Sequence, residues 1–154
     1  MNGVIRLRPY CENYLEKSWG WLRDPEVKTL TMTPDFDRDD QRRFFDGLAH
    51  RSDYKIWGVE LAGAGPIGAA GLKNIAGGSA EYWGYIGEKS AWGQGLGKQM
   101  LAAIEAKAAA IGIDHLYLNV TRENLRAIAL YERAGYVTDN PSAEILNLAK
   151  TLVA

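Results

Sequence analysis

The pattern of apolar residues changes period at a cluster of glycines, Gly93–Gly97, and this change constrains the fold more than any other feature. Before the cluster, three β-rich segments separated by glycine turns predict an antiparallel meander over Tyr54–Leu61, Pro66–Ile75 and Ala80–Gly87. After it, apolar side chains recur every three or four residues, which predicts a long helix with Gly112 as its C′ residue. A strand, a glycine loop, a helix and a further strand form a right-handed crossover, so part of the sheet should be parallel.

Weaker patterns on either side of this unit predict the rest of a mixed α/β domain. The expected elements are strands at Val4–Arg8, His115–Val120, Tyr136–Thr138 and Ala143–Leu148, and helices at Tyr10–Arg23, Asp37–Arg51 and Asn124–Ala134. Asp24-Pro25 is interpreted as the end of the first helix. In the second helix, Phe44 and Phe45 should point inward and Gln41 outward. A chain of 154 residues fits one domain, which we expect to span residues 1–154.

Composition argues against several classes of function. The formal net charge of −1 indicates no general electrostatic attraction to nucleic acid or to a membrane surface. The N-terminus has no apolar signal segment, and no apolar run of about 18 residues occurs, so we expect a cytoplasmic protein. The single cysteine, Cys11, should be a buried or half-buried thiol. His50 and His115 are far apart in sequence and have no cysteine partners, so no metal site is expected.

The segment Trp92–Lys98 carries the chemical information, because a helix should begin among its glycines. Main-chain N–H groups at a helix N-terminus attract phosphate, and glycine lets the anion approach without a Cβ. The spacing does not fit a Walker A loop, because Trp92 and Gln99 stand where that loop needs glycine and Ser or Thr. It also does not fit the G-x-G-x-x-G dinucleotide fingerprint. Another phosphate ligand, such as ATP or NAD, stays an alternative.

Two segments of the chain resemble the GNAT superfamily of N-acetyltransferases. Residues 92–97 match both glycines of its pyrophosphate loop, R/Q-x-x-G-x-G/A, but Trp92 replaces the first Arg or Gln. A Trp-Gly start is similar to the branch that includes ribosomal-protein and spermidine acetyltransferases. Residues 119–136 resemble the late strand-helix-strand segment, N-x-x-A-x-x-L-Y-x-x-x-G-F/Y. The resemblance covers residues 55–138 well and implies a mixed, mostly antiparallel sheet of six to seven strands flanked by about four helices.

The resemblance implies acetyl-CoA as co-substrate and assigns residues to it. The coenzyme pyrophosphate would be held by Gly93, Gln94, Gly95, Leu96, Gly97 and Lys98. In the family the preceding strand separates from its neighbour at a bulge, and the pantetheine arm pairs with the exposed main chain. Here that would involve Tyr85, Ile86 and Gly87, with one N–H stabilising the oxyanion. A flexible turn is the plainer interpretation of the loop, and sheet packing is the plainer interpretation of Tyr85 and Ile86.

Three further side chains are candidates for catalysis or coenzyme binding. By resemblance, Tyr131 donates a proton to the departing thiolate, although a core tyrosine would give the same pattern. Asn124 matches a position that often hydrogen-bonds the coenzyme, or it is a simple N-cap. The acceptor amine must lose a proton, and Glu81 at the start of the pre-loop strand is the candidate base. Glu60 is the alternative base, and an exposed strand-end charge is the plainer interpretation of Glu81.

The predicted function is direct transfer of an acetyl group from acetyl-CoA to a primary amine in a ternary complex. A covalent route is disfavoured because Cys11 lies far from the motif in sequence. The favoured acceptor is a small molecule, such as an amino sugar, polyamine, amino acid or aminoglycoside. A protein N-terminal or ribosomal-protein amine stays an alternative, as does a non-catalytic acyl-CoA-binding module. The resemblance also makes a homodimer plausible.

The acceptor pocket should come from the first two helices and the meander. Trp19, Trp21, Tyr82 and Trp83 are candidates for its walls. Acidic residues within 35–40 could attract a cationic amine. The start of a helix also favours acidic residues, and this is the preferred interpretation of that cluster.

Overall fold

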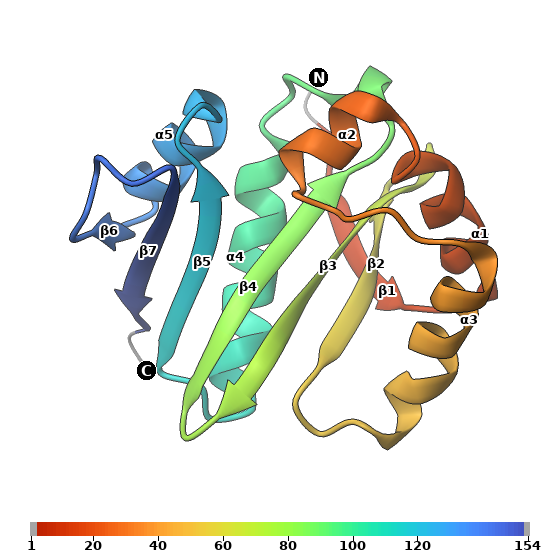
Figure 1. Cartoon of the computed structure of the whole chain (residues 1–154), viewed down its shortest axis with the longest axis horizontal. Coiled ribbons are helices and arrows are strands. Elements are labelled where there is room, and N and C mark those ends of the chain that lie inside the picture. The colour runs from red at the N-terminus through yellow and green to blue at the C-terminus, as the bar shows by residue number, and fades with distance from the viewer. Residues whose placement is uncertain (1–2, 153–154) are drawn as a thin grey trace.

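The computed structural model describes residues 3–152 and contains one seven-stranded mixed sheet (Figure 1). Its strands are β1 (Ile5–Pro9), β2 (Lys55–Leu61), β3 (Gly65–Ala76), β4 (Ser79–Ile86), β5 (His115–Thr121), β6 (Val137–Thr138) and β7 (Ile145–Thr151). Their order across the sheet is β1-β2-β3-β4-β5-β7-β6. The expected mixed sheet of six to seven strands is therefore confirmed.

The pairing pattern follows from the glycine loop and the crossover that it starts. β2, β3 and β4 form an antiparallel meander, as the glycine turns predict. β4 and β5 are joined through helix α4 (Leu96–Ala110) and pair in parallel, whereas the other neighbouring strands pair antiparallel. Gly112 follows α4 with a φ of +87°, a left-handed conformation that glycine adopts without steric cost. The predicted crossover and its C′ glycine are both confirmed.

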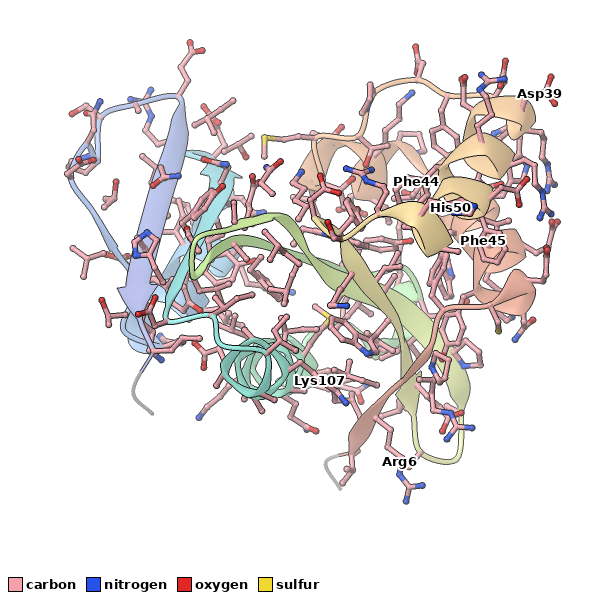
Figure 2. The ribbon with its side chains drawn as sticks, turned by 90° about the horizontal axis from the view of Figure 1, so that it is seen from below. Arg6, Asp39, Phe44, Phe45, His50 and Lys107 are labelled. Atoms are coloured by element: carbon pink, nitrogen blue, oxygen red, sulfur yellow. The ribbon has the colours of Figure 1, made fainter. Side chains whose placement is uncertain are left out.

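Helices lie on both faces of the sheet, as Figure 2 shows from below. Helix α4, marked there by Lys107, lies on one face, and α5 (Leu125–Arg133) packs against the same core. On the other face lie α1 (Glu12–Trp21) and α3 (Arg38–Gly47), the latter marked by Phe44 and Phe45. Short 3₁₀ turns follow α3 (Leu48–His50) and β4 (Lys89–Ala91). This arrangement gives β4 a face toward α4 and an opposite face toward α1.

Helix α2 (Pro25–Leu30) begins where the sequence pattern was interpreted as a stop. Asp24 is its N-cap, with Oδ1 accepting from the N–H groups of Glu26 (2.9 Å) and Val27 (3.3 Å). Pro25 occupies the first helical position, where a missing N–H costs nothing. Val27 is buried and anchors the helix. Asp-Pro-Glu was therefore a start signal for a second helix as well as the end of the first.

The core lies between α4 and the sheet. Fully buried leucines come from three strands, at Leu72, Leu116, Leu118 and Leu148, and α4 contributes Leu101 and Ile104. Burying one such side chain stabilises the fold by about 1.5–3 kcal/mol. The helical face that the sequence predicted for α4 is therefore the face that packs on the sheet.

Two predictions about single side chains are wrong. Gln41 is buried rather than outward, because its Nε2 donates to the main-chain O of Leu15 on α1 (2.8 Å). Cys11 is an exposed free thiol rather than a buried one. It precedes the first turn of α1, and its side chain makes no capping hydrogen bond.

Residues 3–152 contain neither a membrane-spanning helix nor a cluster of metal-ligating side chains. None of the helices there combines the length and apolar character that crossing a bilayer requires. No group of three or more His, Cys, Asp or Glu side chains in this range is arranged to hold a metal ion. The two histidines belong to separate elements, since His50 ends a turn after α3 and His115 starts β5.

Candidate active site

Strand β4 has a partner strand along the whole of one edge but only along part of the other. Its pairing with β3 runs from Glu81 to Ile86 without a register shift. β5 pairs only with Ser79–Glu81, and Figure 1 shows the two strands diverging beyond that point. We call Ser79–Glu81 the closed half of β4 and Tyr82–Ile86 the open half. Within residues 3–152 no strand pairs with the β5-facing edge of the open half. The β3–β4 pair shifts register between Lys73 and Ala76, opposite the closed half, and not within the open half.

The main-chain groups of the open half alternate between β3 and the free edge, as in any antiparallel pair. The N–H of Gly87 donates to the O of Ile67 at the start of β3 (2.7 Å), which fixes the phase of this alternation. Tyr85 therefore directs its main chain toward β3, while Gly84 and Ile86 direct theirs toward the free edge. Of the three residues predicted here, only Ile86 presents its main chain to the free edge. Gly84 is a second such residue, which the sequence pattern did not single out.

Trp92 connects this edge to the glycine loop. Its indole Nε1 donates to the C=O of Ile86 (2.8 Å), which occupies that acceptor. The N–H groups of Gly84 and Ile86 are the free-edge donors beyond Tyr82, which directly follows the last residue paired with β5. The ammonium of Lys89 lies 5.8 Å from the centre of the Trp92 ring. Gln94 is exposed and donates from Nε2 to the O of Ser90 (3.0 Å). Trp92 therefore holds the loop against β4, at the position where the family pattern has Arg or Gln.

The glycine loop ends at an uncapped helix N-terminus. Gly93 and Gly95 have φ values of +78° and +75°, and no atom lies within 4 Å of the place where a Cβ would stand. Gly95 is the N-cap of the 15-residue α4, and no side chain caps this end. The first N–H groups of α4 therefore face an exposed loop, which is the geometry that binds phosphate. Lys98 is exposed in the first turn, whereas Leu96 is 1% exposed and offers only its main chain.

Gly97 has a packing role that the motif alone did not reveal. A Cβ on Gly97 would stand 3.1 Å from Cδ1 of Leu130, so the missing side chain lets α5 approach α4 closely. No residue of α5 is fully buried, although one side of the helix is apolar. Its N-cap is Asn124, whose Oδ1 accepts from the N–H of Ala127 (3.3 Å). Asn124 therefore does act as a cap, and its side-chain amide nitrogen stays available for a ligand.

Tyr131 is brought from α5 to the open half of β4. Its ring packs edge-on against Tyr82 with the ring centres 6.2 Å apart, and against Tyr136 at the same separation. The Tyr131 hydroxyl has no hydrogen-bond partner within residues 3–152, whereas the Tyr136 hydroxyl donates to Oε2 of Glu105 (2.7 Å). Burial raises the pKa of Tyr131 to about 12. At neutral pH its hydroxyl is therefore protonated and able to donate.

Tyr82 lies on the other face of β4 from Trp83, a second candidate for the acceptor wall. Successive side chains of a strand point to opposite faces. Tyr82 therefore faces α4 and is 3% exposed, while Trp83 and Tyr85 face α1. Trp83 stacks on Tyr85 with ring centres 6.3 Å apart, so these two residues form the aromatic surface on the α1 side.

Glu81 is the last residue of the closed half and lies on the α1 side of β4. Its carboxylate accepts from Nδ2 of Asn74 (3.1 Å) and Nδ2 of Asn119 (3.2 Å), and the ammonium of Lys73 is 3.6 Å away. Its side chain is 12% exposed, so it is not the freely solvated strand-end charge of the plainer interpretation. Glu60 is two strands from β4, roughly 10 Å across the sheet, and lies 4.0 Å from Arg8. Tyr131 and Glu81 therefore reach β4 from opposite faces.

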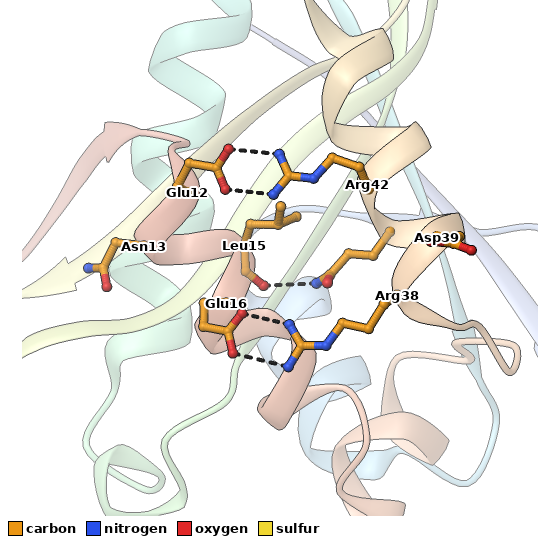
Figure 3. Close-up of a pocket in the computed structure, with 8 residues that line it drawn as sticks. Glu12, Asn13, Leu15, Glu16, Arg38, Asp39 and Arg42 are labelled. Carbon is orange, nitrogen blue, oxygen red and sulfur yellow. Dashed lines mark hydrogen bonds and ion pairs between the residues drawn. The ribbon is translucent and has the colours of Figure 1, made fainter.

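A surface hollow lies away from this site, between α1 and α3 (Figure 3). Its volume is about 560 Å³, and two ion pairs cross it, from Arg42 to Glu12 (2.7 Å) and from Arg38 to Glu16 (2.6 Å). The acidic cluster beside it begins α3, since Asp37 and Asp40 form a reciprocal capping box. The helix-start interpretation of this cluster is therefore confirmed. A smaller hollow of about 280 Å³ borders the glycine loop, with Ile67, Glu88, Ser90 and Gln94 among its lining residues.

Two of the tryptophans predicted as acceptor walls have different surroundings. Trp21 packs where a Cβ on Gly87 would overlap it, and its Nε1 donates to Oε1 of Glu88 (2.8 Å). Gly87 is thus required for the close approach of α1 to the end of β4. Trp19 instead lies under the guanidinium groups of Arg23 and Arg38, at 4.8 and 4.4 Å from the ring centre. Trp21 borders the open half, and Trp19 belongs to the ion-paired surface between the helices.

Comparison with known proteins agrees with this geometry. Residues 15–136 match the model of the Acetyltransferase (GNAT) family, and the chain belongs to this family. Among solved structures, a domain from Methanocaldococcus jannaschii DSM 2661 is similar over 98% of this chain and 100% of its own, with a TM-score of 0.84 and 17% identity. Spermidine N-acetyltransferase from Vibrio cholerae, in complex with CoA and spermine, is similar over 96% of this chain and 95% of its own, with a TM-score of 0.88 and 18% identity. No curated protein sequence is detectably similar.

A second structure of the Vibrio cholerae enzyme, described as dodecameric and in an intermediate state, has a TM-score of 0.81 and 18% identity. It is similar over 96% of this chain and 94% of its own. At such identities the likeness to solved structures shows the fold. The family assignment rests on the sequence match, and it confirms the resemblance that the two motifs carried.

Proposed function

We propose that the chain transfers the acetyl group of acetyl-CoA to a primary amine of a small molecule, by direct attack in a ternary complex. The observation that carries this proposal is the free edge of the open half, which adjoins the uncapped N-terminus of α4. Membership of the acetyltransferase family supports the reaction class. The residues present fit the coenzyme, since the loop offers main-chain donors for a diphosphate and the edge offers donors for an extended amide-bearing arm.

In this proposal the coenzyme supplies the acetyl thioester, and the chain supplies binding, orientation and proton transfer. Gly93, Gly95 and the first turn of α4 hold the diphosphate through main-chain N–H groups. The N–H groups of Gly84 and Ile86 pair with the arm and stabilise negative charge on the thioester oxygen. Tyr131 donates its proton to the departing sulfur, and Glu81 takes a proton from the amine directly or through water. The opposite placement of Tyr131 and Glu81 suits a reaction in which the amine attacks the carbonyl carbon from one side and the sulfur leaves from the other.

The acceptor is proposed to approach from the α1 side, where Glu81, Trp83 and Tyr85 face. Polyamines are among the first acceptors to test, because the Vibrio cholerae enzyme of similar fold is a spermidine N-acetyltransferase. The carboxylates of α1 and of the α2 start, however, are already paired with arginines or Lys89. This pairing favours an acceptor with one amine and an apolar body over a polycation, since a polycation needs free carboxylates.

The first test is ligand-dependent thermal stability. A ligand at about 100 times its dissociation constant adds about 2.7 kcal/mol of stability, which is a measurable shift in Tm. We expect acetyl-CoA and CoA to raise the Tm and ATP and NAD to leave it unchanged. Selective stabilisation by ATP or NAD would reject the proposed function in favour of a nucleotide site.

The second test separates an enzyme from a binding module. A library of amines is screened by the release of free coenzyme thiol, and Tyr131→Phe is then compared with the wild type. Loss of a general acid lowers turnover by about 10²- to 10⁴-fold, while affinity for CoA should stay unchanged. If no amine releases thiol although acetyl-CoA binds, the non-catalytic module is the better description.

The third test concerns the base. Glu81→Gln keeps the shape of the side chain but removes its ability to accept a proton, so turnover should fall by about 10²-fold. Glu60→Gln is the matched control, because Glu60 is a strand carboxylate beside a cation but lies two strands away. Equal turnover in the wild type and Glu81→Gln, or a loss confined to Glu60→Gln, would remove Glu81 from the mechanism.

A further inference from the structure

The hydroxyl of Tyr82 is unpaired although its side chain is buried. Tyr82 begins the open half, faces α4 and is 3% exposed. Within residues 3–152 its hydroxyl has no hydrogen-bond partner, whereas the neighbouring Tyr136 donates to Glu105. A hydroxyl on a buried side chain that has no partner in the protein is available to hydrogen-bond a ligand or water.

The position of the Tyr82 hydroxyl indicates which ligand group it could bind. Tyr82 Oη lies 2.5 Å from the point where a Cβ on Gly84 would stand, so it lies against Gly84 of the open half, on the α4 side of β4. The fully enclosed polar atoms without a partner are Tyr14 Oη and Trp83 Nε1. Tyr82 Oη is not one of them, so it keeps some contact with solvent. The missing side chain of Gly84 leaves the room that this hydroxyl occupies.

We propose that the Tyr82 hydroxyl is a second catalytic tyrosine, which donates a hydrogen bond to the carbonyl oxygen of the bound acetyl thioester. This inference rests on the proposed function. The N–H groups of Gly84 and Ile86 approach that oxygen from the strand, and the Tyr82 hydroxyl approaches it from beneath.

The acetyl transfer forms one bond and breaks one bond. The amine lone pair forms the new C–N bond, and the carbonyl pair moves onto the oxygen that Tyr82 holds. When the C=O bond returns, the C–S bond breaks and the sulfur takes a proton from Tyr131. The amine nitrogen loses its proton to Glu81, directly or through water, and solvent then returns a proton to Tyr131. Tyr82 keeps its own proton throughout. Burial raises the pKa of Tyr82 well above its ordinary value, so the phenol stays a donor.

Binding of acetyl-CoA and of CoA to the full chain, measured by calorimetry, tests the inference without knowledge of the acceptor. Only acetyl-CoA carries the carbonyl oxygen. Tyr82→Phe should therefore weaken acetyl-CoA binding by about two- to tenfold, the value of one neutral hydrogen bond, and leave CoA binding unchanged. Tyr136→Phe is the matched control, since it removes a hydroxyl from the same ring cluster but should leave both affinities unchanged. Equal weakening of both ligands by Tyr82→Phe, or no weakening of either, would overturn the proposal.

Infrared spectroscopy of acetyl-CoA labelled with ¹³C at the carbonyl gives an independent readout. A donated hydrogen bond lowers the carbonyl stretching frequency, so Tyr82→Phe should return it toward the value in water-free solvent. Gly84→Ala provides a second route, because its Cβ would displace Tyr82 Oη and approach Met100 Cε at 3.0 Å. Combined with Tyr82→Phe, Gly84→Ala should add little further loss of acetyl-CoA affinity. An unshifted frequency or fully additive losses would count against the inference.

The two proposals fail in different ways. A wild-type chain that binds neither acetyl-CoA nor CoA overturns the proposed function, and the role of Tyr82 with it. A wild-type chain that binds both, with no difference between Tyr82→Phe and Tyr136→Phe, overturns the role of Tyr82 alone.

Discussion

The closed and open halves of β4 belong to one continuous strand, yet their surroundings differ in one respect. In the closed half, Ala80 is fully buried between β3 and β5 and is paired with the equally buried Leu116. In the open half, Tyr82 is nearly as buried, and β3 stays paired, but the other edge has no strand within residues 3–152. Side-chain packing thus continues where main-chain pairing stops.

This difference indicates which part of the sheet is available to bind a ligand. An unpaired strand edge is a liability that folded proteins usually cover or shorten, because its N–H and C=O groups invite other strands. Here the free edge lies in the interior of the sheet, with β5 turned toward β7 instead. The glycine loop, Trp92 and Tyr131 all converge on it. The closed half should therefore control stability, and the open half should control ligand binding.

The largest expected effect belongs to Leu116, the β5 partner of Ala80 in the closed half. Leu116→Ala removes a fully buried side chain and should lower the free energy of unfolding by about 2–5 kcal/mol, measured by urea denaturation. At a temperature where the variant stays folded, its affinity for CoA should equal that of the wild type. A loss of CoA affinity that parallels the loss of stability would break the division between the two halves.

The glycine loop gives the next largest effect. Gly95→Ala places a Cβ on a residue with positive φ, which costs about 1–2 kcal/mol and disturbs the loop that should hold the diphosphate. We expect CoA affinity to fall by about five- to thirtyfold, measured by calorimetry. Gly63→Ala is the matched control, because Gly63 also has a positive φ and no atom near its Cβ position. Equal CoA affinities of the two variants would show that the loop is only a turn.

Much of this arrangement could be predicted from the sequence, because its signals are local. The change of period at Gly93–Gly97 predicted the crossover, and the two motifs predicted the family. Helix α2 was missed because Asp-Pro reads equally well as a stop and as a start. Contacts between residues far apart in the sequence were harder to predict. The phase of β4 depends on the Gly87–Ile67 hydrogen bond, and without that phase Gly84 could not be selected over Tyr85.

Alkaline pH tests the burial of Tyr131 beside the open half through its effect on the free energy of unfolding. An unfolded tyrosine loses its proton near pH 10, whereas burial raises the pKa of folded Tyr131 to about 12. Between these values the folded chain binds more protons, so the free energy of unfolding falls as pH rises, by up to about 1.4 kcal/mol per pH unit for each such tyrosine. Tyr131→Phe should make this fall less steep in urea titrations at pH 8–11.

Tyr14 is the matched control for that titration. Burial also raises its pKa to about 12, but Tyr14 covers Gly58 on β2, away from the open half. Tyr14→Phe should therefore flatten the pH dependence of stability as Tyr131→Phe does, while only Tyr131→Phe loses turnover. Unchanged pH slopes in both variants would contradict the burial of these hydroxyls.

The smallest expected effect concerns the link between the loop and the open half. Trp92→Phe keeps an aromatic ring beside Lys89 but removes the hydrogen bond to the C=O of Ile86, which is worth about 0.5–1.5 kcal/mol. Because this bond orders the loop that should bind the diphosphate, we expect CoA affinity to fall by about threefold. Trp57→Phe in β2 is the control, since the Trp57 indole N–H has no hydrogen-bond partner in the described part of the chain. If Trp92→Phe lowered the Tm and left CoA affinity untouched, the bond would serve the fold alone, and the loop would bind the diphosphate independently of its link to the open half.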